Sequence, residues 1–174
     1  MSLYHSKFYD MLSEANTREK WREFFGSAEP DLHVRDLESL LRGFAMLIKG
    51  DEYGSSMMRF LNGFSKDAKH YSPQKILYLE SLFDSFLNSC SELKSDAFHG
   101  GQKRFSITLF ESVFVAICSE PYANDMLVTG YIDPKSLNQL RADQQFLDAT
   151  ERGTTSKPNV STRLQRAKEI IQIR

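Results

Sequence analysis

Residues 35–50 read RDLESLLRGFAMLIKG, and a helical pattern is clearest in this stretch. Its apolar side chains recur every three to four residues, which is the spacing of one face of an α-helix. Acidic residues stand near its start, where they suit the helix dipole, and Lys49 and Gly50 close it. Arg35 and Arg42 lie two turns apart and therefore share a face. We expect a helix that is buried on most sides, with these core residues: Leu37, Leu40, Leu41, Phe44, Ala45 and Ile48.

Apolar residues repeat at helical spacing through most of the chain, and no stretch shows the alternation of a β-strand together with a partner strand. We therefore expect an all-α globular bundle of roughly eight helices with no significant sheet. Besides the helix at 35–50, the pattern predicts helices over residues 4–15, 17–26, 53–68, 73–93, 106–119, 121–129, 134–147 and 159–173.

Length and composition fit a single helical domain over residues 4–173. Hydrophobic residues make up 41% and charged residues 26% of the 174 positions, which is ordinary for a globular protein. Residues 1–3 resemble a start added for expression, and the helical pattern begins directly after them. We therefore expect the chain to be a fragment of a longer protein.

The two cysteines and the apolar runs indicate a cytoplasmic protein without membrane contact. Cys90 and Cys118 both lie in apolar helical patterns, so we expect buried, reduced thiols. The start of the chain lacks the apolar segment of a signal peptide. The longest apolar run, residues 113–118, is far too short to cross a membrane.

Charge is distributed unevenly, although the net charge is only −1. Residues 152–174 carry six basic residues and one acidic residue, a charge of +5, which leaves −6 for residues 1–151. A basic segment beside an acidic body indicates a local anionic partner. The candidate contacts with an anion or with DNA are Lys157, Arg163, Arg166 and Lys168.

No motif supplies a catalytic, cofactor-binding or metal-binding site. The four histidines are dispersed, and neither an H-E-x-x-H helix nor a Cys/His cluster occurs. Nucleophile-elbow and P-loop motifs are also missing. Acidic residues such as Asp143 and Asp148 fit solvated surface. We expect no catalytic residue, no cofactor and no metal.

Three polar features remain as functional candidates, each with an ordinary structural alternative. Arg35 and Arg42 suit a buried or interdomain ion pair, although Glu38 stands four residues before Arg42 and suits a surface pair. Residues 152–166 bring hydroxyl side chains to the start of a basic helix, which could hold an anion or form a capped polar loop. The loop FHGGQKR at 98–104 could contact a phosphate or simply join two helices.

Several motifs, taken in order, resemble the helical domain of GmrSD-type restriction proteins. The resemblance spans about residues 8–172 and rests on the number, order and spacing of short matches. They are RDLESLLRGFA at 35–45, Tyr53, FLN at 60–62, AF at 97–98, RFSITLFESVF at 104–114, FLDATERGTT at 146–155, Val160, and RL at 163–164.

Proteins of this family defend bacteria against foreign DNA, and their N-terminal domain has a ParB/sulfiredoxin-like nuclease fold that handles a nucleotide. The resemblance implies that this chain is a non-catalytic helical domain that packs against such a domain and contacts DNA. The full-length protein would be an NTP-dependent nuclease or its regulatory subunit. The DGQQR-type motif of the N-terminal domain is absent here, because residues 142–146 read ADQQF. We interpret these family-like positions as structural or interdomain-coupling residues: Arg35, Arg42, Asn62, Glu111, Thr154 and Arg163.

Two other functions remain open. The first is a free-standing α-helical module that binds nucleic acid or a protein, which the +5 segment suggests. The second is a self-sufficient hydrolase, which would need chemistry that no motif in the sequence supplies.

Overall fold

The computed structural model describes residues 5–30 and 34–174. Within these ranges the chain is mostly helical, and its only β-structure is two isolated bridges, His99 with Phe105 and Ile132 with Ile173. The expected all-α class is confirmed. The elements in the described residues are α1 (Lys7–Ala15), α2 (Glu19–Phe25), α3 (Arg35–Lys49), the 3-10 turn η2 (Gly50–Glu52), α4 (Met57–Ala68), α5 (Pro73–Ser89), α6 (Ile107–Ala123), α7 (Pro134–Arg141), α8 (Gln144–Glu151) and α9 (Lys157–Ile170).

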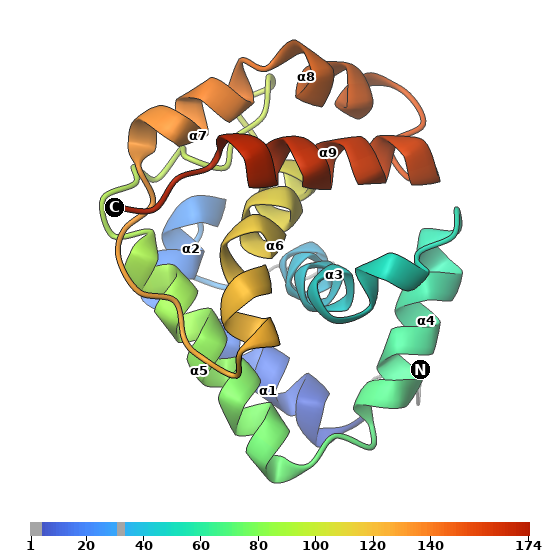
Figure 1. The fold of residues 1–174 in the computed structure, drawn as a ribbon. Helices are drawn as coiled ribbons and strands as arrows, with labels where there is room; N and C mark the ends of the chain where they lie inside the picture. The colour runs from blue at the N-terminus through green and yellow to red at the C-terminus, as the bar shows by residue number, and fades with distance from the viewer. Residues whose placement is uncertain (1–4, 31–33) are drawn as a thin grey trace.

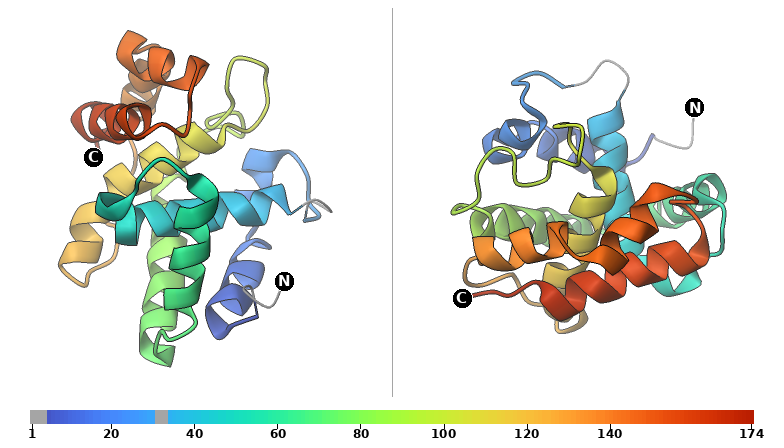
Figure 2. Two further views of the ribbon diagram at one scale, coloured as in Figure 1. Left: turned by 90° about the vertical axis from the view of Figure 1, so that its right-hand side faces the viewer. Right: turned by 90° about the horizontal axis from the view of Figure 1, so that it is seen from above.

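Helices α3 and α6 cross at the centre of the molecule (Figure 1). Helix α9 packs on α6 and is flanked by α7 and α8, while α1 packs along α5. A second view shows α7, α8 and α9 on one side of α3, with α4 and α5 on the other (Figure 2, left). The helix predicted from residues 35–50 is therefore central, because it contacts α1, α4 and α6.

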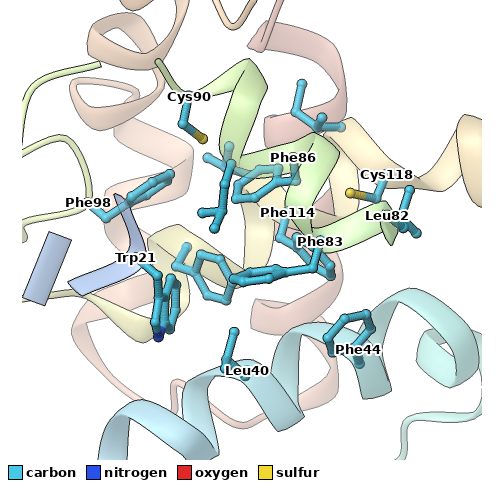
Figure 3. Close-up of a cluster of buried hydrophobic side chains, with 14 of the residues drawn as sticks. Trp21, Leu40, Phe44, Leu82, Phe83, Phe86, Cys90, Phe98, Phe114 and Cys118 are labelled. Carbon is cyan, nitrogen blue, oxygen red and sulfur yellow. The ribbon is translucent and has the colours of Figure 1, made fainter. Parts of the chain in front are cut away.

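Aromatic rings fill the space where α3, α5 and α6 meet (Figure 3). Phe44, Phe83, Phe86 and Phe114 are all buried. Phe86 meets Phe114 edge to face, with ring centroids 5.1 Å apart and ring planes at 85°. Such pairs add about 0.5–1.5 kcal/mol beyond burial alone. The predicted core face of α3 is confirmed, with Ile48 partly buried at its edge.

Most helices in the described residues have a serine or an aspartate as their N-cap. In each case the side-chain oxygen of the residue before the helix accepts a hydrogen bond from a backbone N–H of the first turn. Such a bond satisfies a donor that has no partner within the helix. These caps are Ser6, Ser56, Ser72, Ser106, Asp133, Asp143 and Ser156.

Two predicted helices are wrong in extent because of these caps. The predicted helix at 53–68 begins only at Met57, since Ser56 caps it, and Tyr53 is buried outside the helix at 3% exposure. The final helix begins at Lys157 rather than at 159, because Ser156 is its cap.

Three further boundaries differ from the prediction. The helix expected at 121–129 does not form, because Pro121 lies in the last turns of α6 and the chain is irregular after Asn124. The helix expected at 134–147 is divided into α7 and α8, since Asp143 caps α8. Leu147, an apolar residue of α8, is 37% exposed. Helix α5 ends at Ser89 rather than near 93.

Cys90 and Cys118 are free and buried, as expected. Burial raises the pKa of both thiols, so neither is a reactive thiolate at neutral pH. No helix in the described part of the chain is long and apolar enough to cross a membrane.

The close approach of α3 to α6 depends on Gly43. A Cβ atom at this position would lie 3.1 Å from ring carbons of both Phe110 and Phe114. These two rings are buried and stack on each other with centroids 5.6 Å apart. Since packed rings cannot shift without cost, a side chain at Gly43 overpacks the crossing.

We expect Gly43→Ala to lower the free energy of unfolding by about 1 kcal/mol, because overpacking costs about 1–3 kcal/mol and outweighs a helix-propensity gain of about 0.5–1 kcal/mol. Gly63 is the matched control, because it lies in α4 and no atom would come within 4 Å of its added Cβ. Gly63→Ala should raise stability by about 0.5–1 kcal/mol through helix propensity. Urea unfolding measures both changes, and equal stabilisation by both substitutions would contradict the tight crossing.

Tyr78 of α5 holds the irregular segment that follows α6. Its hydroxyl donates to the carbonyl oxygen of Met126 at 2.8 Å, and the carbonyl oxygen of Pro121 lies 3.3 Å away. Burial, helped by the charge of Asp125, raises the pKa of Tyr78 to about 12. The folded protein therefore holds this proton more tightly than the unfolded chain does.

The stabilisation from the Tyr78 proton is complete below pH 10, the unfolded pKa, and is lost as the pH rises toward about 12. We expect Tyr78→Phe to cost about 1 kcal/mol at pH 7, through the lost hydrogen bond. Between about pH 10 and 12 the stability of this variant should fall less than that of the parent. Denaturant unfolding followed by circular dichroism across this range measures the difference, and parallel declines would show that Tyr78 does not contribute.

Candidate functional site

A buried cluster of three charged side chains joins α3, α6 and α9. Oε2 of Glu111 on α6 accepts a hydrogen bond from Nε of Arg42 on α3 at 2.9 Å. Oε1 of Glu111 lies 3.9 Å from Nη2 of Arg163 on α9. Glu111 and Arg163 are 0% exposed, and Arg42 is 8% exposed. One carboxylate therefore connects three helices in the interior.

Backbone carbonyl groups complete the surroundings of Arg163. Its Nη1 donates to the carbonyl oxygen of Ala149 at 2.6 Å, and its Nη2 donates to that of Thr154 at 2.7 Å. The hydroxyl of Tyr53 donates to the neighbouring carbonyl oxygen of Thr155. The cluster thus fixes the segment between α8 and α9 as well as the helices themselves.

The cluster contains two positive charges and one negative charge. Desolvation lowers the pKa of the Arg163 guanidinium, while the charge of Glu111 acts in the opposite direction. Burial raises the pKa of Tyr53 nearby. One polar atom on each charged side chain has no hydrogen-bond partner among the described residues: Arg42 Nη2, Glu111 Oε1 and Arg163 Nε.

The structure brings together four of the six family-like positions. Arg42, Glu111 and Arg163 form the cluster, and Thr154 contributes its backbone carbonyl rather than its side chain. The surface pair of Arg42 with Glu38 is not formed, because the guanidinium turns inward to Glu111. Two positions lie elsewhere: Asn62, half-buried on α4, and Arg35, exposed at the start of α3.

The predicted DNA contacts of the C-terminal segment need correction. Arg163 is fully buried, so its guanidinium is not available to DNA. Arg166 is held by Asp143, at 2.7 Å between Nη2 and Oδ1, and also pairs with Glu169. Asp143, expected to be solvated, is instead a helix cap whose pKa Arg166 lowers. Lys157 and Lys168 are exposed.

The polar segment before α9 behaves as a capped loop. Ser156 caps the helix by accepting a hydrogen bond from the backbone N–H of Asn159. The carbonyl groups of Thr154 and Thr155 are bound by Arg163 and Tyr53. Of the two interpretations of this segment, the capped polar loop therefore agrees with the geometry.

A cavity of about 700 Å³ lies between α2, the start of α3 and the loop that precedes α6. Arg35 and Arg42 of α3 line one side of it, and His99, Lys103 and Arg104 line the other. Figure 2 shows this loop next to α2, and the first turns of α3 complete the lining. Two features that the sequence presented separately, the α3 arginines and the loop at 98–104, thus face one cavity.

Backbone hydrogen bonds hold the basic loop in a tight turn. The N–H of Gly100 donates to the carbonyl oxygen of Arg104 at 2.8 Å, and that of Ser106 donates to Phe98 at 2.7 Å. Lys103 has φ 57°, and Val34 beside Arg35 has φ 54°. Non-glycine residues in this region cost about 1–3 kcal/mol each and tend to occur at functional sites.

The sequence did not indicate the buried ion pair that joins α2 to α3. Nη1 of Arg22 donates to Oδ2 of Asp36 at 2.6 Å, and both side chains are buried. Arg22 also donates to backbone carbonyl groups of Ser27 and Glu29. Asp36 suits the helix dipole, but it also lies four residues before Leu40 on the apolar face of the helix, and a buried acid at such a position needs a cation.

Comparison of the chain with models of known protein families, with curated protein sequences and with solved structures finds no match. In the described part of the chain, no three His, Cys, Asp or Glu side chains are grouped so that they could hold a metal ion.

The charges in the buried cluster predict which substitution lowers the free energy of unfolding most. Glu111→Gln leaves two buried guanidinium groups without a counter-charge and should cost about 3–5 kcal/mol of unfolding free energy. Arg42→Met leaves the opposite charges of Glu111 and Arg163 and should cost less. The control is Arg59→Met, an exposed change on α4, which should stay within about 0.5 kcal/mol. Chemical unfolding measures all three, and a loss for Arg42→Met that exceeds that for Glu111→Gln would overturn the charge argument.

Proposed function

We propose that this chain is a non-catalytic helical domain of a GmrSD-like DNA-restriction protein. It packs against a ParB-like domain that handles a nucleotide, and the enzymatic activity belongs to the full-length protein as an NTP-dependent nuclease or its regulatory subunit. On this proposal the chain itself needs no cofactor and works in the cytoplasm.

One observation carries the proposal. Positions 42, 111, 154 and 163 belong to separate motifs of the resemblance, and they meet in one buried cluster. A set of short motifs spread along a chain is expected to recur together when its members form one structural unit, because changing one member leaves a buried charge unpaired. This contact pattern supports treating the motifs as one signature rather than as separate chance matches.

A ParB-like partner gives the first test. The gene that encodes this chain should also encode a ParB-like segment, or lie directly beside a gene that does. When the two parts are produced as separate polypeptides with different affinity tags, we expect them to co-purify. Absence of a ParB-like segment from both this gene and its neighbours would remove the basis of the proposal.

A second candidate function is a nucleic-acid-binding module, favoured by two exposed lysines on α9. Lys157 begins this helix and Lys168 lies in its last turn, and both line the same surface hollow. Each lysine that contacts a phosphate releases a counterion and steepens the dependence of binding on salt.

For this candidate, fluorescence anisotropy with a labelled DNA duplex should give binding that weakens steeply with salt. The double substitution Lys157→Ala with Lys168→Ala should weaken binding and lower the slope of log K against log salt by up to about 2. Lys66→Ala with Lys69→Ala removes the same charge from exposed positions at the end of α4 and is the control. Absence of binding at low salt would dispose of this candidate.

A further inference from the structure

We propose that the cavity between α2, the start of α3 and the loop at 98–105 binds a nucleoside phosphate. Its ligand has no part in the proposed function, and the cavity lies apart from the α9 lysines, so the inference extends beyond that function. Its walls combine the two chemistries that such a ligand requires, a basic side for phosphate and an apolar side for the nucleoside.

The size of the cavity suits a ligand of this class. Its volume is about 700 Å³, and pockets for small molecules and cofactors typically measure about 300–1,000 Å³. It is also built by three separate segments of the chain, so a ligand in it would be held from several sides rather than on one surface.

The cavity lining contains more basic than acidic side chains. Of the Lys, Arg and Glu residues in its lining, five are basic and two are acidic (Glu29 and Glu38). Arg22 and Arg42 are engaged with Asp36 and Glu111. Lys103 and Arg104 are exposed and form no ion pair with any described residue. These two side chains, on one loop, are the phosphate ligands in this proposal.

Arg42 adds a buried hydrogen-bond donor to the cavity lining. Arg42 lines the cavity, is 8% exposed, and has one guanidinium nitrogen, Nη2, without an acceptor in the described part of the chain. Because Arg42 belongs to a cluster with an excess positive charge, its side of the cavity favours an anion electrostatically. Arginine donors suit phosphate oxygens in geometry as well as in charge.

Another part of the lining is aromatic. Phe25 and Phe105 stack on each other, with ring centroids 4.0 Å apart and planes at 21°, and both are partly exposed. Pro30 and Ile107 extend this apolar wall. Basic groups beside aromatic rings are the combination by which proteins hold single nucleotides of unpaired strands. A free nucleotide and a nucleotide of a single strand share this chemistry.

The test uses the chain as it is, with isothermal titration calorimetry against AMP, ATP, adenosine, inorganic phosphate and a ten-nucleotide single-stranded DNA. We expect a nucleotide, free or in the strand, to bind, and adenosine and inorganic phosphate each to bind at least tenfold more weakly than that nucleotide. Tighter binding of AMP or ATP identifies a free nucleotide as the ligand, and tighter binding of the oligonucleotide identifies a nucleotide of a strand.

The variant Lys103→Ala with Arg104→Ala should weaken binding at least tenfold while the melting temperature stays unchanged. Lys66→Ala with Lys69→Ala removes equal charge at a distant surface and should leave the affinity unchanged. Absence of binding by AMP, ATP and the oligonucleotide at millimolar concentration would overturn the proposal, as would binding that both double variants reduce equally. Co-purification with a ParB-like domain has no bearing on this result, so the two proposals can fail separately.

Discussion

The buried carboxylate of Glu111 is the constraint on which the centre of this molecule depends. A carboxylate out of contact with water needs cations close to it. Here those cations come from α3 and α9, on two sides of α6. The requirement fixes how the three helices sit relative to one another, while the surrounding aromatic core supplies the apolar burial that a charged cluster cannot supply.

The sequence predicted the helical class and the face of α3 because apolar spacing is local information. Helix ends were predicted less well where a cap lies beyond the apolar pattern, as at Ser56 and Ser156. The partner of Arg42 could not be derived in this way. Glu38 is the nearer acid in sequence, but Glu111 is in contact, because the packing of α3 on α6 decides the choice.

Charge along the chain also proved a poor guide to charge on the surface. The C-terminal segment is the most basic part of the sequence, yet Arg163 is internal, and Arg166 and Arg174 are paired with acidic residues. The loop at 98–104 has a smaller charge, but its two exposed basic side chains stand next to α3 in three dimensions. Only the folded arrangement distinguishes basic residues that stabilise the protein from those that remain for a partner.

The position of the single tryptophan determines what its fluorescence can report. Trp21 is completely buried, and its indole N–H donates to Asn16 at 2.9 Å. Its ring also contacts Phe25 and Phe105, with centroids 4.9 and 5.5 Å away, and these are the rings that line the basic cavity. The indole therefore emits from an apolar setting directly behind the cavity wall. Its fluorescence is a natural, label-free signal for both the integrity of the core and events in the cavity.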